Sequence, residues 1–211
     1  MRRLFIRRLL IVSLLFLSSF AQADQTMQFP PFNAVKTDGV MDIDITVGSA
    51  QSVVVKGADG DIAKIKFQVE DGALFITGPQ SKHDVFFSND SKVIITVPAL
   101  RLFKGKGVGE VVIKNIDNDR IDLAYEGVGS LEASGKTKWL RLKGNGVGGI
   151  DTRKLLAVDA DVDFDGVGEV DVYVSNHLNA VVNGVGSLTY YGKPKSVNKS
   201  ADGIGSINAG N

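Results

Sequence analysis

Residues 101–211 alternate apolar and polar side chains with a period of two, and the alternation restarts at regular intervals. It is clearest in residues 121–125, 160–164 and 178–182, and a shorter alternating run follows each of these. Such alternation is typical of β-strands that turn one face toward a core. We predict pairs of short strands. The inward side chains of the first strands are Ile121, Leu123, Tyr125, Leu140, Leu142, Ala160, Val162, Phe164, Leu178, Ala180 and Val182, and those of the second are Val111, Ile113, Leu131, Ala133, Val170, Val172, Leu188 and Tyr190.

A short glycine phrase, Gly-Val-Gly or Gly-Ile-Gly, separates the two strands of each pair. Its six copies follow one another at steps of 20, 19, 20, 18 and 19 residues, a regularity that marks an internal repeat. The repeated glycines are Gly107, Gly109, Gly127, Gly129, Gly146, Gly148, Gly166, Gly168, Gly184, Gly186, Gly203 and Gly205.

The central valine of each phrase does not fit a single alternation with the inward residues on either side. Val128 comes three positions after Tyr125, and Leu131 comes three positions after Val128, whereas one face of a flat strand repeats every two residues. We therefore predict that the chain bends at both glycines, whose backbone tolerates the φ and ψ values of a corner. In this interpretation the central valine fills the interior between two structural corners.

A period near 19 residues with two short strands and a glycine corner predicts one coil of a solenoid. The fold class is therefore all-β, a right-handed parallel β-helix with an irregular N-terminal β section. The hand follows the usual hand of parallel crossovers, and successive coils rise by about 4.8 Å. Residues 24–100 also alternate, for example at Met41, Ile43 and Ile45. We expect this section to continue the stack irregularly and to cover its open end, with a loop at residues 79–91.

The first 23 residues predict a cleaved signal peptide. Four arginines precede an apolar run that ends at Phe20, and Ala21-Gln22-Ala23 forms an A-x-A exit. The alternative is a membrane anchor, but serines interrupt the run and a span needs roughly 20 apolar residues. We expect cleavage after Ala23, an exported product in the periplasm or outside a bacterial cell, and a mature domain at 24–211 that does not span a membrane.

Charge and cysteine content narrow the function classes. The whole chain has 24 basic and 24 acidic side chains, and removal of residues 1–23 leaves 20 against 24, a net charge of −4. This mild acidity argues against nucleic acid as a partner. The sequence has no cysteine, so thiol chemistry and disulfides are excluded, and a chain of this length buries enough core without them.

Four carboxylates on one predicted strand are the strongest candidate for chemistry. Asp159, Asp161, Asp163 and Asp165 alternate with apolar residues and so point outward together. Carboxylate oxygens suit Ca²⁺, but we favour columns of opposite charges between coils. In one column Lys143 lies beside Asp163. Another column contains Asp122, Arg141 and Asp161. No metal or other cofactor is therefore expected. A polysaccharide lyase-like enzyme would use the same carboxylates with Arg141 or Arg153, and this alternative stays open.

Adjacent aromatic residues are the best candidates for contact with a partner. Phe86 and Phe87 fall in the predicted loop, and Tyr191 ends the last alternating run before a glycine. Exposed aromatic pairs on loops are unusual and often mark interaction sites.

The chain also resembles a known family on particular residues. "VPAL" at residues 97–100 precedes the repeated glycine phrases, and the tail carries Leu188, Tyr190, Gly192 and Pro194 in the spacing L-x-Y-x-G-x-P before "GIGSI". Over about residues 30–207 this pattern resembles the head GIN domain family of auto-transporter adhesins, DUF2807. The resemblance implies a secreted or periplasmic β-helix-like domain without catalytic residues. Members often have serine where this chain has the central valine.

Together these observations favour an exported, non-enzymatic, adhesin-like binding domain whose ligand is a glycan or a cell-envelope protein. The alternatives are the carbohydrate-active enzyme described above and a structural component of the cell envelope. Binding to extended ligands would discriminate the first from the last, and cleavage of polysaccharide would identify the enzyme.

Overall fold

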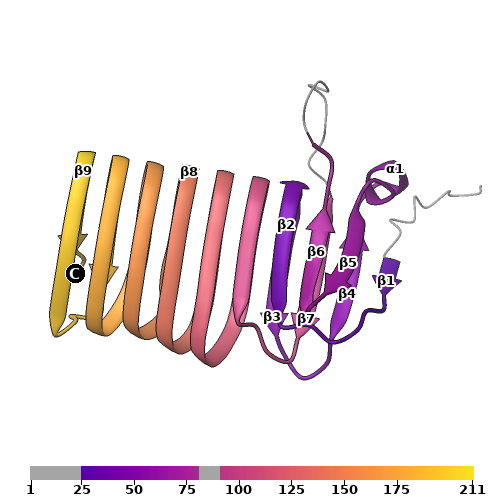
Figure 1. The fold of residues 1–211 in the computed structure, drawn as a ribbon, viewed down its shortest axis with the longest axis horizontal. Helices are drawn as coiled ribbons and strands as arrows, with labels where there is room; N and C mark the ends of the chain where they lie inside the picture. The colour runs from indigo at the N-terminus through magenta and orange to yellow at the C-terminus, as the bar shows by residue number, and fades with distance from the viewer. Residues whose placement is uncertain (1–24, 81–90) are drawn as a thin grey trace, which may run out of the picture.

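The structure, a computed structural model, describes residues 25–80 and 91–211. The chain is nearly all-β, and its strands belong to one open sheet (Figure 1). The elements are β1 (Gln25–Met27), β2 (Ala34–Val40), β3 (Asp42–Val47), β4 (Ser52–Lys56), α1 (Asp59–Ile62), β5 (Lys66–Glu70), β6 (Ala73–Thr77), β7 (Lys92–Val97), β8 (Leu102–Tyr191) and β9 (Ser196–Ala209). The predicted signal peptide at residues 1–23 lies outside the described residues. Within the described part, no helix is long and apolar enough to cross a membrane.

The long strand β8 builds most of the molecule. Its passes stand side by side along the long axis in Figure 1 as successive coils. The first pass pairs in parallel with β2, from Ala34↔Leu102 to Val40↔Val108. The second pass pairs in parallel with β3, from Ile43↔Val111 to Thr46↔Lys114. Each coil therefore has a pass that continues the β2 side, which we call the β2 face, and a pass that continues the β3 side, the β3 face.

The glycine phrases stack on one another where the chain passes from the β2 face to the β3 face. β9 pairs in parallel with the end of β8 so that Gly184 lies opposite Gly203 and Gly186 opposite Gly205. Gly148 has a φ of +145°, and a Cβ on it would overlap the carbonyl oxygen of Gly129 in the preceding coil. Glycine is needed at this position because it tolerates the positive φ and because the main chain of the preceding coil occupies the place of a side chain.

The structure contradicts the interior position predicted for the central valines. Their exposed fractions run from 44% to 51%, and that of Ile204 is 80%. The alternation in fact passes through the phrase unbroken, because Gly127 and Gly129 occupy the inward positions between Tyr125 and Leu131. The prediction placed the central valine in the interior because it is apolar. The inward positions of the phrase are instead occupied by its two glycines, which have no side chain.

The inward positions predicted for the flanking strands are confirmed. All of them are buried except Tyr190, which is partly buried and packs against the core. They form columns through the coils, such as the one that begins with Val35 and Phe103 and passes through Leu123 and Leu142. A fully buried aliphatic side chain contributes roughly 1.5–3 kcal/mol before conformational entropy is subtracted. These columns are therefore the main stabilising element of the stack.

The N-terminal section extends the same stack in an irregular chain order. β6 pairs in parallel with β2, and β7 pairs in parallel with β3, so this later segment lies beyond the first coil. β5 and β4 then add antiparallel strands outside β6 and β7, and β1 follows β4. The antiparallel strands cover this end of the sheet. Gly39 lies opposite Gly107, so the phrase has an earlier copy that the sequence analysis missed because Met41 replaces its second glycine.

Candidate binding surface

Two adjoining hollows on the outer side of the β2 face form the largest open depression that we describe. Their volumes are about 480 and 400 Å³, and they share Lys143, Asp163 and Asn183. We call the two together the trough. Its outward-facing side chains are Lys104, Ala124, Glu126, Arg141, Lys143, Asn145, Asp161, Asp163, Asp165, Asn179, Val181 and Asn183.

The trough exists because the same positions of neighbouring coils lie next to one another. Outward residues recur every second place along a strand, and the stacked passes bring them into columns whose members are about 4.8 Å apart. Small residues such as Ala124 stand in these columns between longer charged side chains. The result is a depression that runs across the coils, parallel to the axis of the stack.

The trough is nearly balanced in charge. The predicted contact between coils is confirmed, because Lys143 Nζ lies 3.4 Å from Asp163 Oδ2. Both side chains are about half exposed, at 52% and 50%. Exposed pairs of this kind stabilise a fold by only about 0–1 kcal/mol. The two charged groups are therefore available to a ligand at little cost to the stack.

Two of the four aspartates of the 159–165 strand have side-chain partners in neighbouring coils. Asp159 accepts a hydrogen bond of 2.7 Å from Asn176 Nδ2 in the next coil, and Asp163 faces Lys143. Within the described residues, no group of three or more acidic, histidine or cysteine side chains could hold a metal ion. Residues two apart on a strand are about 6.6–6.8 Å apart along the backbone, whereas two oxygens that bind one Ca²⁺ at 2.3–2.6 Å are at most about 5.2 Å from each other. The arrangement favours hydrogen bonds and ion pairs between coils.

A second polar cluster lies on the β3 face. Arg153 donates two hydrogen bonds to the carboxylate of Asp151, at 3.0 and 2.6 Å, and its Nε lies 3.5 Å from Asp171 Oδ2. The hydrogen bond from Arg153 lowers the pKa of Asp151, whereas burial raises the pKa of Asp171. Tyr191 belongs to this cluster, since the Arg153 guanidinium lies 5.9 Å from its ring centre.

The structure therefore separates the predicted contact residues. Tyr191 is on the β3 face with Arg153, whereas Arg141 is on the β2 face with three of the aspartates, Asp161, Asp163 and Asp165. Phe86 and Phe87 lie outside the described residues. Sequence reasoning did not single out Asn179 and Asn183, although counting back from the glycine phrase places them in the same columns as Asp161 and Asp165.

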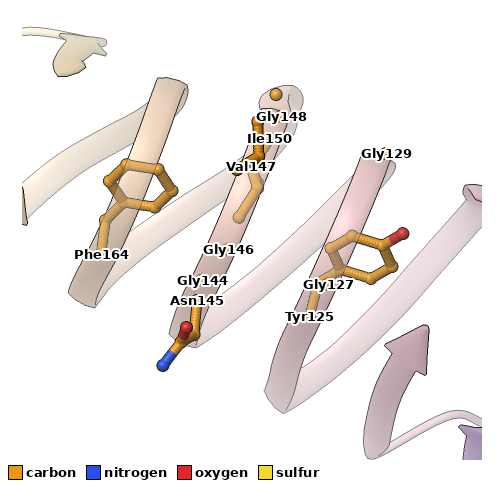
Figure 2. A pocket seen from close by; sticks show the side chains of 11 residues that line it. Tyr125, Gly127, Gly129, Gly144, Asn145, Gly146, Val147, Gly148, Ile150 and Phe164 are labelled. Carbon is orange, nitrogen blue, oxygen red and sulfur yellow. The ribbon is translucent and has the colours of Figure 1, made fainter. Parts of the chain in front are cut away.

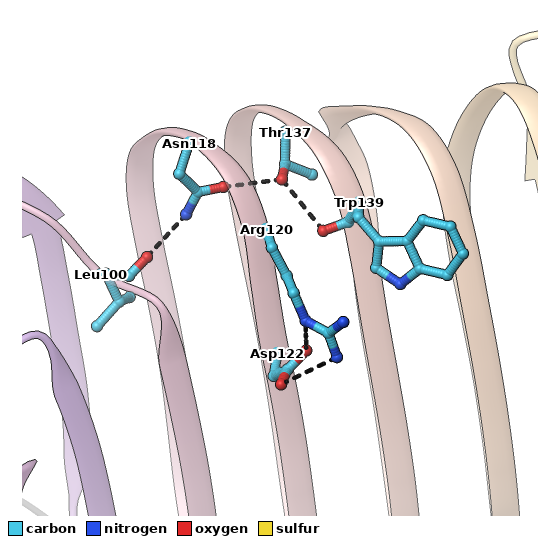
Figure 3. A network of polar contacts seen from close by, with 6 residues as sticks. All are labelled: Leu100, Asn118, Arg120, Asp122, Thr137 and Trp139. Atoms are coloured by element: carbon cyan, nitrogen blue, oxygen red, sulfur yellow. Dashed lines mark hydrogen bonds and ion pairs between the residues drawn. The ribbon is translucent and has the colours of Figure 1, made fainter.

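The remaining side of the coils carries a hydrogen-bonded ladder (Figure 3). Asn118 Nδ2 donates to the carbonyl of Leu100 at 2.7 Å, and Thr137 Oγ1 donates to Asn118 Oδ1 at 2.8 Å. Trp139 is half-buried beside this ladder. No buried side-chain nitrogen or oxygen in the described part of the chain lacks a hydrogen-bond partner. This ladder connects neighbouring coils.

A small cavity inside the stack is also structural (Figure 2). It lies beside Gly144 between Tyr125 and Phe164 and measures about 10 Å³, which is about the space of one water molecule. The Tyr125 hydroxyl lies 2.9 Å from the carbonyl oxygen of Gly109 and 3.1 Å from that of Val128. Burial raises the pKa of Tyr125. The phenol therefore connects two coils in its neutral form.

Comparison with known proteins finds the same fold in solved structures of bacterial proteins. A putative adhesin from Bacteroides fragilis matches with a TM-score of 0.70 and 26% identity, over 90% of this chain and 98% of that chain. A putative adhesin from Parabacteroides merdae matches with a TM-score of 0.58 and 17% identity, over 90% and 96%, a likeness that concerns the fold alone. No curated protein matches this chain.

The family assignment rests on a match that spans most of the chain. The model of the family described as "Putative auto-transporter adhesin, head GIN domain" (DUF2807) matches residues 31–194. That range includes β2 through β8 and five of the six predicted glycine phrases. The chain belongs to the head GIN domain family, DUF2807.

Proposed function

We propose that this protein is an exported, non-enzymatic, adhesin-like binding domain whose trough holds an extended, uncharged glycan. The family and the adhesin-like neighbours support the adhesin-like class. One observation supports this choice of ligand. The trough runs across several coils and is lined by hydrogen-bonding side chains of both charges.

The chemistry of the trough fits a polysaccharide strand. Amide and carboxylate groups recur once per coil, at about 4.8 Å, which is close to the length of one sugar ring in an extended chain. Asn179 and Asn183 each offer a donor and an acceptor, and vicinal hydroxyls need both. The trough has three basic and four acidic side chains, so it lacks the strong single sign that a highly charged polymer needs.

A glycan array with the mature protein, followed by calorimetry on the retained oligosaccharides, tests the proposal. We expect uncharged oligosaccharides of several rings to bind, with little dependence on salt concentration. Asn179→Ala with Asn183→Ala should weaken binding at least tenfold. The matched control is Asn208→Ala, which removes an exposed amide that pairs with Ser206 on the β3 face. Retention of no glycan, or equal loss in the control, contradicts the proposal.

The lyase-like alternative has its own assay. Incubation with acidic polysaccharides would yield new reducing or unsaturated ends if the chain cleaved them. Loss of that activity in Asp161→Asn and Asp163→Asn would assign an enzyme to the trough and refute a purely binding role. Absence of both binding and cleavage would instead favour a structural component of the envelope.

Export and the hand of the coils complete the proposal. The basic start, apolar run and A-x-A exit of residues 1–23 support cleavage after Ala23. N-terminal sequencing of the protein recovered from a bacterial host should begin at Asp24.

The parallel pairing of β2, β3 and β9 with β8 supports a parallel β-helix, and the usual hand of parallel crossovers supports a right-handed one. A crystal structure of the mature chain tests the hand directly.

A further inference from the structure

The central residues of the glycine phrases form an apolar ridge on the outside of the molecule. We define the ridge by its exposed members, Val108, Val128, Val147, Val167, Val185 and Ile204. The register places Val185 opposite Ile204, and Val40 of the first coil opposite Val108. Since stacked strands are about 4.8 Å apart, the side chains follow one another in an unbroken line.

The ridge is large for an exposed apolar feature. About half of each valine and 80% of Ile204 is open to solvent, which gives roughly 500 Å² in total, as large as the largest apolar patch on a typical monomer. The stack does not require it, because the neighbouring outward columns of the same coils are polar. A β-branched residue suits an exposed strand position, but threonine would satisfy that requirement equally well.

Acidic residues border the ridge on both sides. Glu126 and Asp165 stand directly before their glycine phrases, and Glu110 and Glu169 stand directly after theirs. The basic residue of the border, Lys106, lies 3.9 Å from Glu126, which offsets its charge. A second copy of this chain or an anionic membrane would bring negative charge against negative charge. A partner with an apolar stripe between basic residues is complementary.

We infer that the ridge binds a basic amphipathic α-helix of another protein. Five steps of about 4.8 Å give the ridge a length of about 24 Å, which matches a helix of about 16 residues at 1.5 Å per residue. The apolar residues of such a helix recur along one stripe, and basic side chains beside the stripe reach the acidic borders. A β-strand laid across the ridge would contact one or two valines.

The ridge and the trough are tested by substitutions at different residues. Variants of the ridge leave Asn179 and Asn183 unchanged, so loss of helix binding and loss of glycan binding are separate results. The probe is a synthetic 18-residue peptide of leucine and lysine with leucine at helical i, i+3, i+4 and i+7 spacing. A peptide with glutamate in place of every lysine is the charge control.

Fluorescence anisotropy at 0.15 M salt gives the Kd for each pair. We expect the lysine peptide to bind the mature protein and the glutamate peptide not to bind. Val147→Thr with Val167→Thr should raise the Kd at least tenfold while leaving the thermal unfolding midpoint unchanged, because threonine is also β-branched. Leu156→Thr with Val158→Thr, which removes exposed apolar area elsewhere on the coils, should change the Kd less than twofold.

A second pair of variants tests the acidic borders. Glu110→Gln with Glu169→Gln, which lie outside the trough, should weaken binding and reduce its dependence on salt concentration. If the lysine peptide fails to bind at millimolar concentration, or if the threonine variants of the ridge and of the control site bind it equally, the inference is wrong.

Discussion

The last glycine of one phrase, Gly148, and the glycine that follows it, Gly149, should respond oppositely to the same substitution. Gly148 has a φ of +145°, and a Cβ added to it would overlap the Gly129 carbonyl oxygen of the preceding coil. Gly149 has no such φ, and a Cβ there would meet no atom within 4 Å. Alanine at these adjacent positions therefore isolates the stacking contact from the general effect of losing a glycine.

The expected cost at Gly148 comes from two sources. A side chain held at a φ that only glycine adopts readily costs about 1–3 kcal/mol. The overlap must be relieved by moving two coils apart, which weakens one or two main-chain hydrogen bonds at about 0.5–1.5 kcal/mol each. We expect Gly148→Ala to lower the free energy of unfolding by about 4 kcal/mol, since both effects act together. Gly149→Ala should raise it by about 0.4–1 kcal/mol because the unfolded chain loses freedom.

Thermal unfolding followed by circular dichroism measures both variants on the mature chain. At about 2–4 °C per kcal/mol for a domain of this size, Gly148→Ala should lower the midpoint by about 8–16 °C. Gly149→Ala should raise it by about 1–4 °C. Urea titration gives the same comparison as free energies. If the two variants differ by less than 1 kcal/mol, the close contact between main chains does not determine the stacking of the coils.

Three further predictions concern titration and the exposed end of the sheet. Burial raises the pKa of Tyr125 above its ordinary value of 10.0, so the native state should lose stability as the pH rises past 10, and Tyr125→Phe should abolish this alkaline loss in urea titrations. Arg153 lowers the pKa of Asp151 from 3.8, so the destabilisation by Arg153→Gln should be largest above pH 3.8 and should shrink as the pH falls below it. β9 is the last strand of the stack and pairs with β8 alone. Lys199 occupies an inward column of β9 and donates to a main-chain carbonyl at 2.9 Å, and a charged side chain there discourages pairing with another sheet edge. Lys199→Leu should therefore cause association that rises with concentration in light scattering, whereas Lys195→Leu should scatter as the unsubstituted chain does.

The sequence predicts the interior of the coils well because burial imposes a period of two on every pass. That period identified Leu123, Leu142 and the other inward residues correctly. It failed at Val128 because apolar character was taken as evidence of burial. The glycines have positive φ values, and a Cβ at their inward positions would overlap the main chain of a neighbouring coil. The sequence of a single strand carries no information on this contact between coils.

The order of the N-terminal strands and the shape of the trough could not be predicted in the same way. β6 and β7 lie between the first coil and the antiparallel end strands, although they come later in the chain. Pairing between distant segments has no local signal. The ion pair of Lys143 with Asp163 followed from the repeat spacing, but the hollow around it depends on small residues such as Ala124 in other coils.

Stability and binding therefore depend on different positions of the repeat. The coils are held by main-chain contact at the glycines and by inward aliphatic residues, where substitutions cost several kcal/mol. Outward columns make few such contacts, and substitutions there usually change stability by less than about 0.5 kcal/mol. The two adhesin structures from Bacteroides fragilis and Parabacteroides merdae share this fold at 26% and 17% identity. Such divergence is expected when the outward columns are free to change, so a ligand must be inferred from the trough and the ridge of this chain itself.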